Sequence, residues 1–167
     1  MKKKLVMGMM SAVLMAGMVL PVHAANTTEG DMDVSYTEAN VYVISIPQSI
    51  TLQQGEETAA QQIKGISINI EPGKEVQVKV SNGIDNGAVS LTLEGGTDTD
   101  KVTSTVSLTS GGNGIDTDTV VAKFSGQSKD PSAGTGTLYF TGLPDDMKAG
   151  TWKGQLTFTV SLEGVTP

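Results

Sequence analysis

The stretch Glu75-Val76-Gln77-Val78-Lys79-Val80 alternates polar and apolar residues without an exception. Successive side chains of a β-strand point to opposite faces, so this alternation predicts a strand with one buried and one solvated face. The same pattern occurs just upstream in Ile66-Ser67-Ile68-Asn69-Ile70, and Pro72-Gly73 between the two favours a tight turn. Half-buried strands joined in this way are typical of an antiparallel sheet.

Similar alternation continues along the chain and is interrupted by turn residues. Pairs such as Asn82-Gly83 and Asn86-Gly87 supply residues that accept positive φ between strands. At most one turn of helix is expected after residue 24, at residues 57–62. We therefore predict an all-β fold, an antiparallel β-sandwich of Ig-like or jelly-roll-like type with eight to nine short strands. The other alternating segments are 89–93, 102–108 (where Ser104 interrupts the inward face), 120–124, 138–140 and the longest, 152–162.

The N-terminus has the pattern of a secretory signal peptide over residues 1–24. Three lysines at 2–4 precede an uncharged apolar run at 5–20, and small residues stand before Ala25. The run of 16 residues is short for a bilayer span, which needs ~20. We therefore expect cleavage, secretion and no stable membrane insertion afterwards.

The expected mature chain consists of a leader and one domain. Residues 25–40 are polar and indicate a flexible leader, with a short strand near Val34-Tyr36, and residues 41–167 form a single β-sandwich domain. The first strand, 41–47, carries apolar residues on both faces, which is expected where both sides are covered. We interpret it as a strand of its own sandwich. Pairing with a neighbouring molecule is the alternative, since a flexible leader precedes it. Alternation resumes at 49–52 after Pro47.

Composition excludes several function classes. Without residues 1–24, eight lysines stand against 18 acidic residues, a net charge of −10, which opposes binding to nucleic acid. The chain contains no cysteine and no arginine, and its single histidine, His23, lies in the expected signal peptide. The usual general base, thiolate nucleophile and soft metal ligands are therefore missing. We expect no enzymatic activity and no disulfide.

Two segments resemble a family of small secreted proteins of Gram-positive, clostridia-like bacteria. Tyr42-Val43-Ile44-Ser45-Ile46-Pro47-Gln48-Ser49-Ile50-Thr51-Leu52 resembles their YxVxIPxxIxL opening. Ala149-Gly150-Thr151-Trp152-Lys153-Gly154-Gln155-Leu156-Thr157-Phe158-Thr159-Val160 resembles their closing AGxWxGxxxFxI segment. The resemblance implies an extracellular β-sandwich at the cell surface or in the matrix, and it carries over no catalytic residue.

Two weak sets of ligand-binding candidates follow from residue type. Acidic pairs in Gly-rich turns offer oxygen ligands that suit Ca²⁺, although their spacing is not that of an EF-hand. They are Asp98, Asp100, Asp116 and Asp118. Trp152 could stack on a sugar, but its parity with Leu156 and Phe158 favours a place in the core or at its rim. Tyr139 is out of phase with its apolar neighbours and is expected to point outward.

We expect a secreted, non-catalytic structural or adhesive protein of the cell surface or extracellular matrix. Its partners would be surface or matrix proteins, glycans or further copies of itself, and no cofactor other than Ca²⁺ is considered. One alternative is a carbohydrate-binding module. A second is a carboxylate-dependent hydrolase, which needs two acids at a defined separation, one with a pKa raised by burial. Nothing in the sequence selects such a pair.

Overall fold

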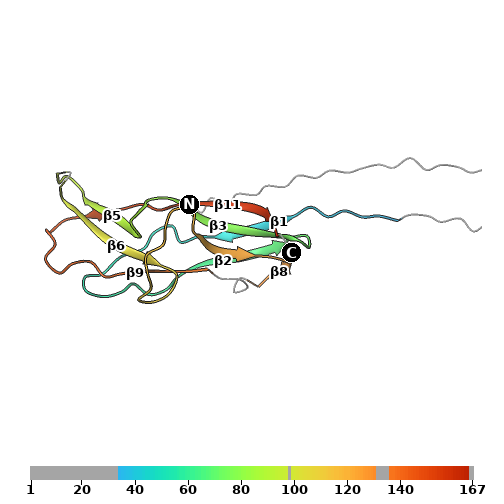
Figure 1. The fold of residues 1–167 in the computed structure, drawn as a ribbon, viewed down its shortest axis with the longest axis horizontal. Helices are drawn as coiled ribbons and strands as arrows, with labels where there is room; N and C mark the ends of the chain where they lie inside the picture. Colours follow the sequence, from blue (N-terminus) through green and yellow to red (C-terminus); the bar gives the residue numbers. More distant parts are fainter. Residues whose placement is uncertain (1–33, 98, 131–135, 166–167) are drawn as a thin grey trace, which may run out of the picture.

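The computed structural model describes residues 34–97, 99–130 and 136–165, and within them it contains strands and no helix (Figure 1). Eight strands have five or more residues, and three have two residues each. The strands are β1 (Val41–Ser45), β2 (Gln61–Asn69), β3 (Lys74–Asn82), β4 (Ile84–Asp85), β5 (Ala88–Leu93), β6 (Lys101–Ser107), β7 (Val120–Phe124), β8 (Gln127–Ser128), β9 (Gly136–Phe140), β10 (Trp152–Lys153) and β11 (Thr157–Gly164).

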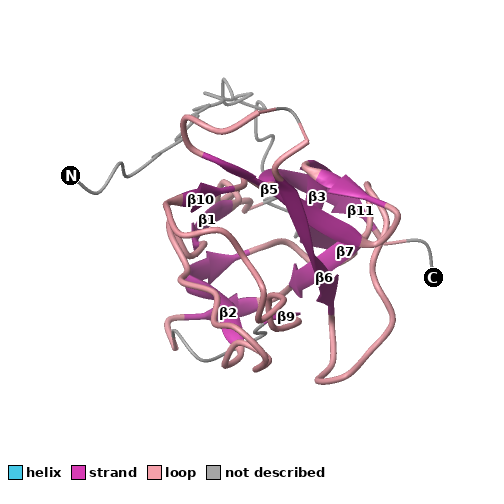
Figure 2. Ribbon diagram, turned by 90° about the vertical axis from the view of Figure 1, so that its left-hand side faces the viewer, coloured by secondary structure: helices cyan, strands magenta, loops and turns pink. Residues whose placement is uncertain are grey.

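These strands form two antiparallel sheets. The large sheet has the order β1-β2-β9-β6-β5-β10, with β4 paired to β5 and β8 paired to β2, and the small sheet has the order β11-β3-β7. Figure 2 shows β3, β7 and β11 on one side of the body and β1, β2 and β10 on the other. The predicted all-β, antiparallel, sandwich-like fold is confirmed.

The core lies between the two sheets and is apolar. The alternation that predicted β3 places Val76, Val78 and Val80 inward, and each is 0% exposed. Their partners in the small sheet continue the same face, because Val78 pairs with Val160 on one side and with Ala122 on the other. Burial of such side chains stabilises by about 1.5–3 kcal/mol each. A chain without disulfides depends on this core.

The predicted turns form as their residues require. Pro72-Gly73 joins β2 to β3 in a turn closed by the bond from the Lys74 N–H to the Glu71 carbonyl oxygen (3.2 Å), and Gly73 has a φ of 82°. Asn86 (φ 48°) and Gly87 (φ 80°) form the two-residue connection between β4 and β5. Two successive positive φ values are characteristic of the type I′ hairpin turn, which matches the twist of the flanking strands.

The prediction of one long strand over 152–162 is wrong. The chain pairs first with the large sheet, through β10 and β5, and then with the small sheet, through β11 and β3. It crosses between the sheets at residues 154–156. Gly154 permits a close passage there, because a Cβ at this position would lie 2.6 Å from the Ser90 carbonyl oxygen. The alternation of apolar residues could not reveal the crossing, because it continues unchanged from one sheet to the other.

Three smaller expectations are also corrected. Residues 49–52 form no strand, since they follow Pro47, which lacks an N–H, and run as an irregular segment. Val34-Tyr36 forms no strand because no neighbouring strand pairs with it. The possible helical turn at 57–62 is absent, and its last two residues begin β2. The expectation that Ser104 interrupts the apolar inward face is confirmed, because Ser104 is buried there and its hydroxyl donates to the Thr141 carbonyl oxygen at 2.7 Å.

The N-terminal strand of the domain lies at a sheet edge. Among the described residues β1 pairs with β2 and with no other strand, and this pairing agrees with the interpretation of 41–47 as part of its own sandwich. The described part of the leader, residues 34–40, runs outward from the body as an irregular segment (Figure 1). The signal-peptide prediction lies outside the described residues. Within residues 34–165, as far as they are described, no helix has the length and hydropathy to cross a membrane.

Candidate functional site

An apolar groove of about 680 Å³ lies between the chain segments that adjoin the two edge strands of the large sheet. Residues 46–52, which follow β1, form one wall, and residues 150–156, around β10, form the other. The groove has a size typical of ligand-binding pockets in proteins. In Figure 1, β3 and β11 of the small sheet lie toward one end of the body, whereas β5, which contributes to the groove, lies toward the other.

The floor of the groove consists of inward-facing residues of β5 and β9. Val89 and Leu91 come from β5, Leu138 and Phe140 come from β9, and all four are buried. Phe158 of β11 closes the groove on the side of the small sheet. The floor is therefore continuous with the core and offers an apolar surface to an occupant.

The wall at residues 46–52 carries an unpaired backbone. No backbone hydrogen bond joins Gln48–Leu52 to the rest of the described chain, and the nearest such bond runs from the Leu143 N–H to the Gln53 carbonyl oxygen at 2.8 Å. Backbone donors and acceptors without protein partners are a ready template for another extended segment. The groove thus combines apolar side chains with free main-chain groups.

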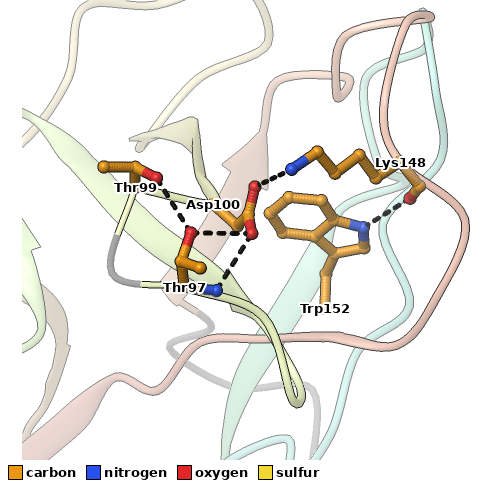
Figure 3. A network of polar contacts seen from close by, with 5 residues as sticks. All are labelled: Thr97, Thr99, Asp100, Lys148 and Trp152. Carbon is orange, nitrogen blue, oxygen red and sulfur yellow. Dashed lines mark hydrogen bonds and ion pairs between the residues drawn. The ribbon is translucent and has the colours of Figure 1, made fainter.

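Trp152 stands at the rim of the groove and is held by a polar network (Figure 3). Its indole Nε1 donates to the Lys148 carbonyl oxygen at 3.1 Å, and the Lys148 ammonium group forms an ion pair with the Asp100 carboxylate. Asp100 also accepts from the N–H and the hydroxyl of Thr97, both at 3.0 Å. The bond from Lys148, followed by those from Thr97, lowers the pKa of Asp100 from 3.8 to about 2. The network ties the loop before β6 to the loop before β10.

The predicted calcium ligands are separated into different environments. Asp100 is engaged by Lys148, and Asp98 lies outside the described residues. Asp116 and Asp118 lie in the turn before β7, where Asp118 has a φ of 69° and its N–H donates to the Val80 carbonyl oxygen at 2.7 Å. No group of three His, Cys, Asp or Glu side chains suited to a metal gathers among the described residues. Calcium binding stays a prediction.

The two aromatic candidates do not form one platform. Tyr139 lies on β9 on the face opposite to Leu138 and Phe140, half-buried and paired across the strands with Ser107. The groove is on the other face, where Trp152 stands. Of the two residues, the structure therefore brings only Trp152 to the groove.

Among the described residues, the clearly shifted carboxylate pKa values named below are all lowered. Hydrogen bonds to the charged form are the leading cause in every case, which stabilises the ionised state. This is the opposite of the raised pKa that a general acid needs. These residues, with the leading hydrogen-bond partner of each, are Glu57 (Ser110), Glu71 (Lys74), Glu75 (Lys123) and Asp100 (Lys148).

Sequence reasoning missed the groove walls at 46–52 and 150–156. Pro47 and the glycines at 150 and 154 were visible signals that regular pairing ends there. They could not show that both interruptions would face the same space. Comparisons with protein-family models, with characterised proteins and with solved structures returned no match to the chain. The resemblance to clostridia-like secreted proteins accordingly stays a prediction.

Proposed function

We propose that the chain is an exported, non-catalytic structural or adhesive component of the cell surface or extracellular matrix, and that it binds its partners in the groove. The observation that carries the proposal is the apolar groove with an unpaired backbone along one wall. This combination suits an extended polypeptide. Main-chain hydrogen bonds supply affinity, and apolar side chains at alternate positions fill the floor.

The groove chemistry favours a protein partner over a small polar ligand. Its floor is built from Val, Leu and Phe side chains, whereas its polar side chains other than Gln61 are exposed. Lys153, the only charged residue of the lining, is paired with Glu94 at 2.9 Å. An apolar floor without a free charge recognises apolar side chains.

Binding of the chain to the surface or matrix of the producing cells tests the proposal. Ile50→Asp places a charge on the groove wall, and Ile66→Asp places the same charge on the solvated face of β2, where Ile66 is 42% exposed. We expect the wild type and Ile66→Asp to bind alike and Ile50→Asp to bind at least tenfold more weakly, with both variants checked for native circular dichroism. Equal binding by the two folded variants would contradict the proposal.

A carbohydrate ligand is the second candidate, and the position of Trp152 at the rim favours it. The side-chain amides of Gln48 and Gln155, which also line the groove, form no hydrogen bond within the described chain and could serve sugar hydroxyls. A glycan array with the wild type and Trp152→Phe separates the two candidates. If the wild type binds a glycan and Trp152→Phe binds it more weakly, the result would support a carbohydrate ligand. If no glycan binds, this candidate is excluded.

A further inference from the structure

We propose that the groove of one molecule binds the leader of a second copy, with Val34 and Tyr36 as the side chains that enter it. This inference rests on the proposed function, because it takes the groove to be the docking site. It names the occupant as an extended segment of the same chain. The result would be a head-to-tail row of identical molecules.

The leader has the pattern that the groove requires. Val34 and Tyr36 are 83% and 86% exposed, although both are large apolar or aromatic residues. They are two positions apart, so in an extended segment their side chains point to the same side, about 7 Å from each other. Ser35 and Thr37 point to the opposite side in that conformation. A strand that lies over an apolar floor needs such an arrangement, with an apolar face toward the floor and a polar face toward solvent.

The leader is held in a direction that points away from its own groove. Asn40 forms two hydrogen bonds with Glu71, one from its Nδ2 to Glu71 Oε1 (3.2 Å) and one from the Glu71 N–H to its Oδ1 (2.7 Å). These bonds fix the chain at the turn between β2 and β3. From there the leader runs out beyond β1, whereas β5, which forms the groove floor, lies toward the other end of the body (Figure 1).

Chain length also keeps Tyr36 out of its own groove. Tyr36 is four residues from Asn40, a reach of about 14 Å, while the near end of the groove at Ile46 is six residues along β1, about 20 Å away. The turn needed to reverse the chain would shorten the reach further. Tyr36 can therefore meet a groove of this kind only on another molecule.

The geometry sets the form of the assembly. The leader and the groove are different surfaces of the molecule, so the contact between two copies is heterologous, and each new copy offers another leader and another groove. Because the two surfaces lie toward opposite ends of the body, copies add in a row. Association should therefore grow with protein concentration without stopping at a dimer.

Site-directed cross-linking tests the contact directly, because the chain contains no cysteine. Thr37→Cys in residues 25–167, which keeps Val34 and Tyr36, is mixed with a mass-tagged Ser49→Cys variant, Ser49 being an exposed residue of the groove wall. The matched control is tagged Ser90→Cys, an exposed serine on the outward face of β5. We expect the mixed disulfide with Ser49→Cys to form at least tenfold faster than with Ser90→Cys. Equal rates would overturn the proposal.

Sedimentation of charge variants provides the second test. We expect the mean mass of the wild type and of Ser35→Asp/Thr37→Asp to rise with concentration, and Val34→Asp/Tyr36→Asp to stay monomeric. A dimer that persists in Val34→Asp/Tyr36→Asp would assign the contact to the free edge of β1 and overturn the proposal. If neither the wild type nor any variant associates, but Ile50→Asp still weakens binding to the cell surface at least tenfold, this inference fails while the proposed function stands.

Discussion

The two ends of this sandwich are built from the same kind of sequence but are closed in different ways. At one end, which we call the closed half, the small sheet covers β2, and Val76, Val78 and Val80 are fully buried. At the other, the open half, β5 and β9 are covered by the irregular walls at 46–52 and 150–156, and the groove lies between them. Regular pairing produces a sealed core, whereas the irregular walls leave an open groove above the buried apolar residues of β5 and β9.

From this comparison we infer that the closed half supplies most of the stability and that the open half is the one suited to binding. Buried side chains packed between two sheets contribute most of the free energy of unfolding. A half-buried wall contributes less and is freer to rearrange around a partner. The following predictions test this division, beginning with the largest expected effect.

An Ile→Ala substitution should lower the free energy of unfolding more in the closed half than in the open half. Ile63 is 0% exposed on β2, so Ile63→Ala should lower the free energy of unfolding by about 2–5 kcal/mol. Ile50, which is only half-buried on the groove wall, should lose about 1 kcal/mol on the same change. Urea unfolding of both variants measures the difference, and equal costs would break the comparison.

The second prediction concerns a tight contact between the two sheets at Gly136. A Cβ on Gly136 of β9 would lie 2.1 Å from the Val121 carbonyl oxygen of β7, which cannot move without disturbing the small sheet. Gly136→Ala should therefore destabilise by about 1–3 kcal/mol. Gly154→Ala, in the irregular wall of the open half, should cost less, because that segment can shift. Thermal unfolding of the pair checks the order, and a larger loss for Gly154→Ala would contradict it.

Trp152 should be of intermediate importance. Trp152→Ala removes a half-buried ring and its hydrogen bond to the Lys148 carbonyl oxygen, at a cost of about 1–2 kcal/mol. Its indole fluorescence, the only tryptophan signal in the chain, should also respond to an occupant of the groove. Titration with a peptide copy of residues 30–40 should shift the emission maximum. An unchanged spectrum in the presence of bound peptide would place the binding site elsewhere.

The smallest effect is expected at Asp100, and it depends on pH. The folded-state pKa is about 2, below the ordinary 3.8, so the stabilisation is fully present above pH 3.8 and is lost as the pH falls through 2. Asp100→Asn should lower the Tm at pH 7 and leave it nearly unchanged near pH 2. Lys148→Met should show the same dependence, because Lys148 is the leading cause of the shift. If the variants lowered the Tm equally at pH 7 and at pH 2, the ionised Asp100 carboxylate would not be the source of the stabilisation.

The sequence was sufficient to predict the strands and turns that depend on local residue patterns. The alternation over 75–80 predicted β3, and Asn86-Gly87 predicted the positive-φ turn before β5, because strand alternation and positive φ are local properties. The crossing at 154–156 was missed, since a change of sheet leaves parity intact. The groove was missed for a related reason. It depends on which segment covers β5, and that is decided by contacts between residues far apart in the chain.

The site candidates were predicted less well than the fold. Parity placed Trp152 at the core or its rim, and the structure has it half-buried at the groove, but no pattern indicated its bond to Lys148. Asp100 was chosen as a metal ligand by residue type, whereas the structure pairs it with a lysine 48 positions away. Residue type indicates which chemistry is available, and only the fold decides which groups meet.

The attachment of Asn40 and Val165, which flank the first and last strands, to one turn has a mechanical consequence. Asn40 is bonded to Glu71, and the Val165 N–H donates to the Gly73 carbonyl oxygen at 2.8 Å, so β1 and β11 are both fastened at the turn between β2 and β3. A force pulling the two ends apart would peel each strand from this turn inward, breaking its hydrogen bonds one after another. A force between the leader and the groove would instead run along β1 and load its pairs with β2 together, in shear. The domain should therefore resist less force when it is pulled at Asn40 and Val165 than when it is pulled between the leader and the groove.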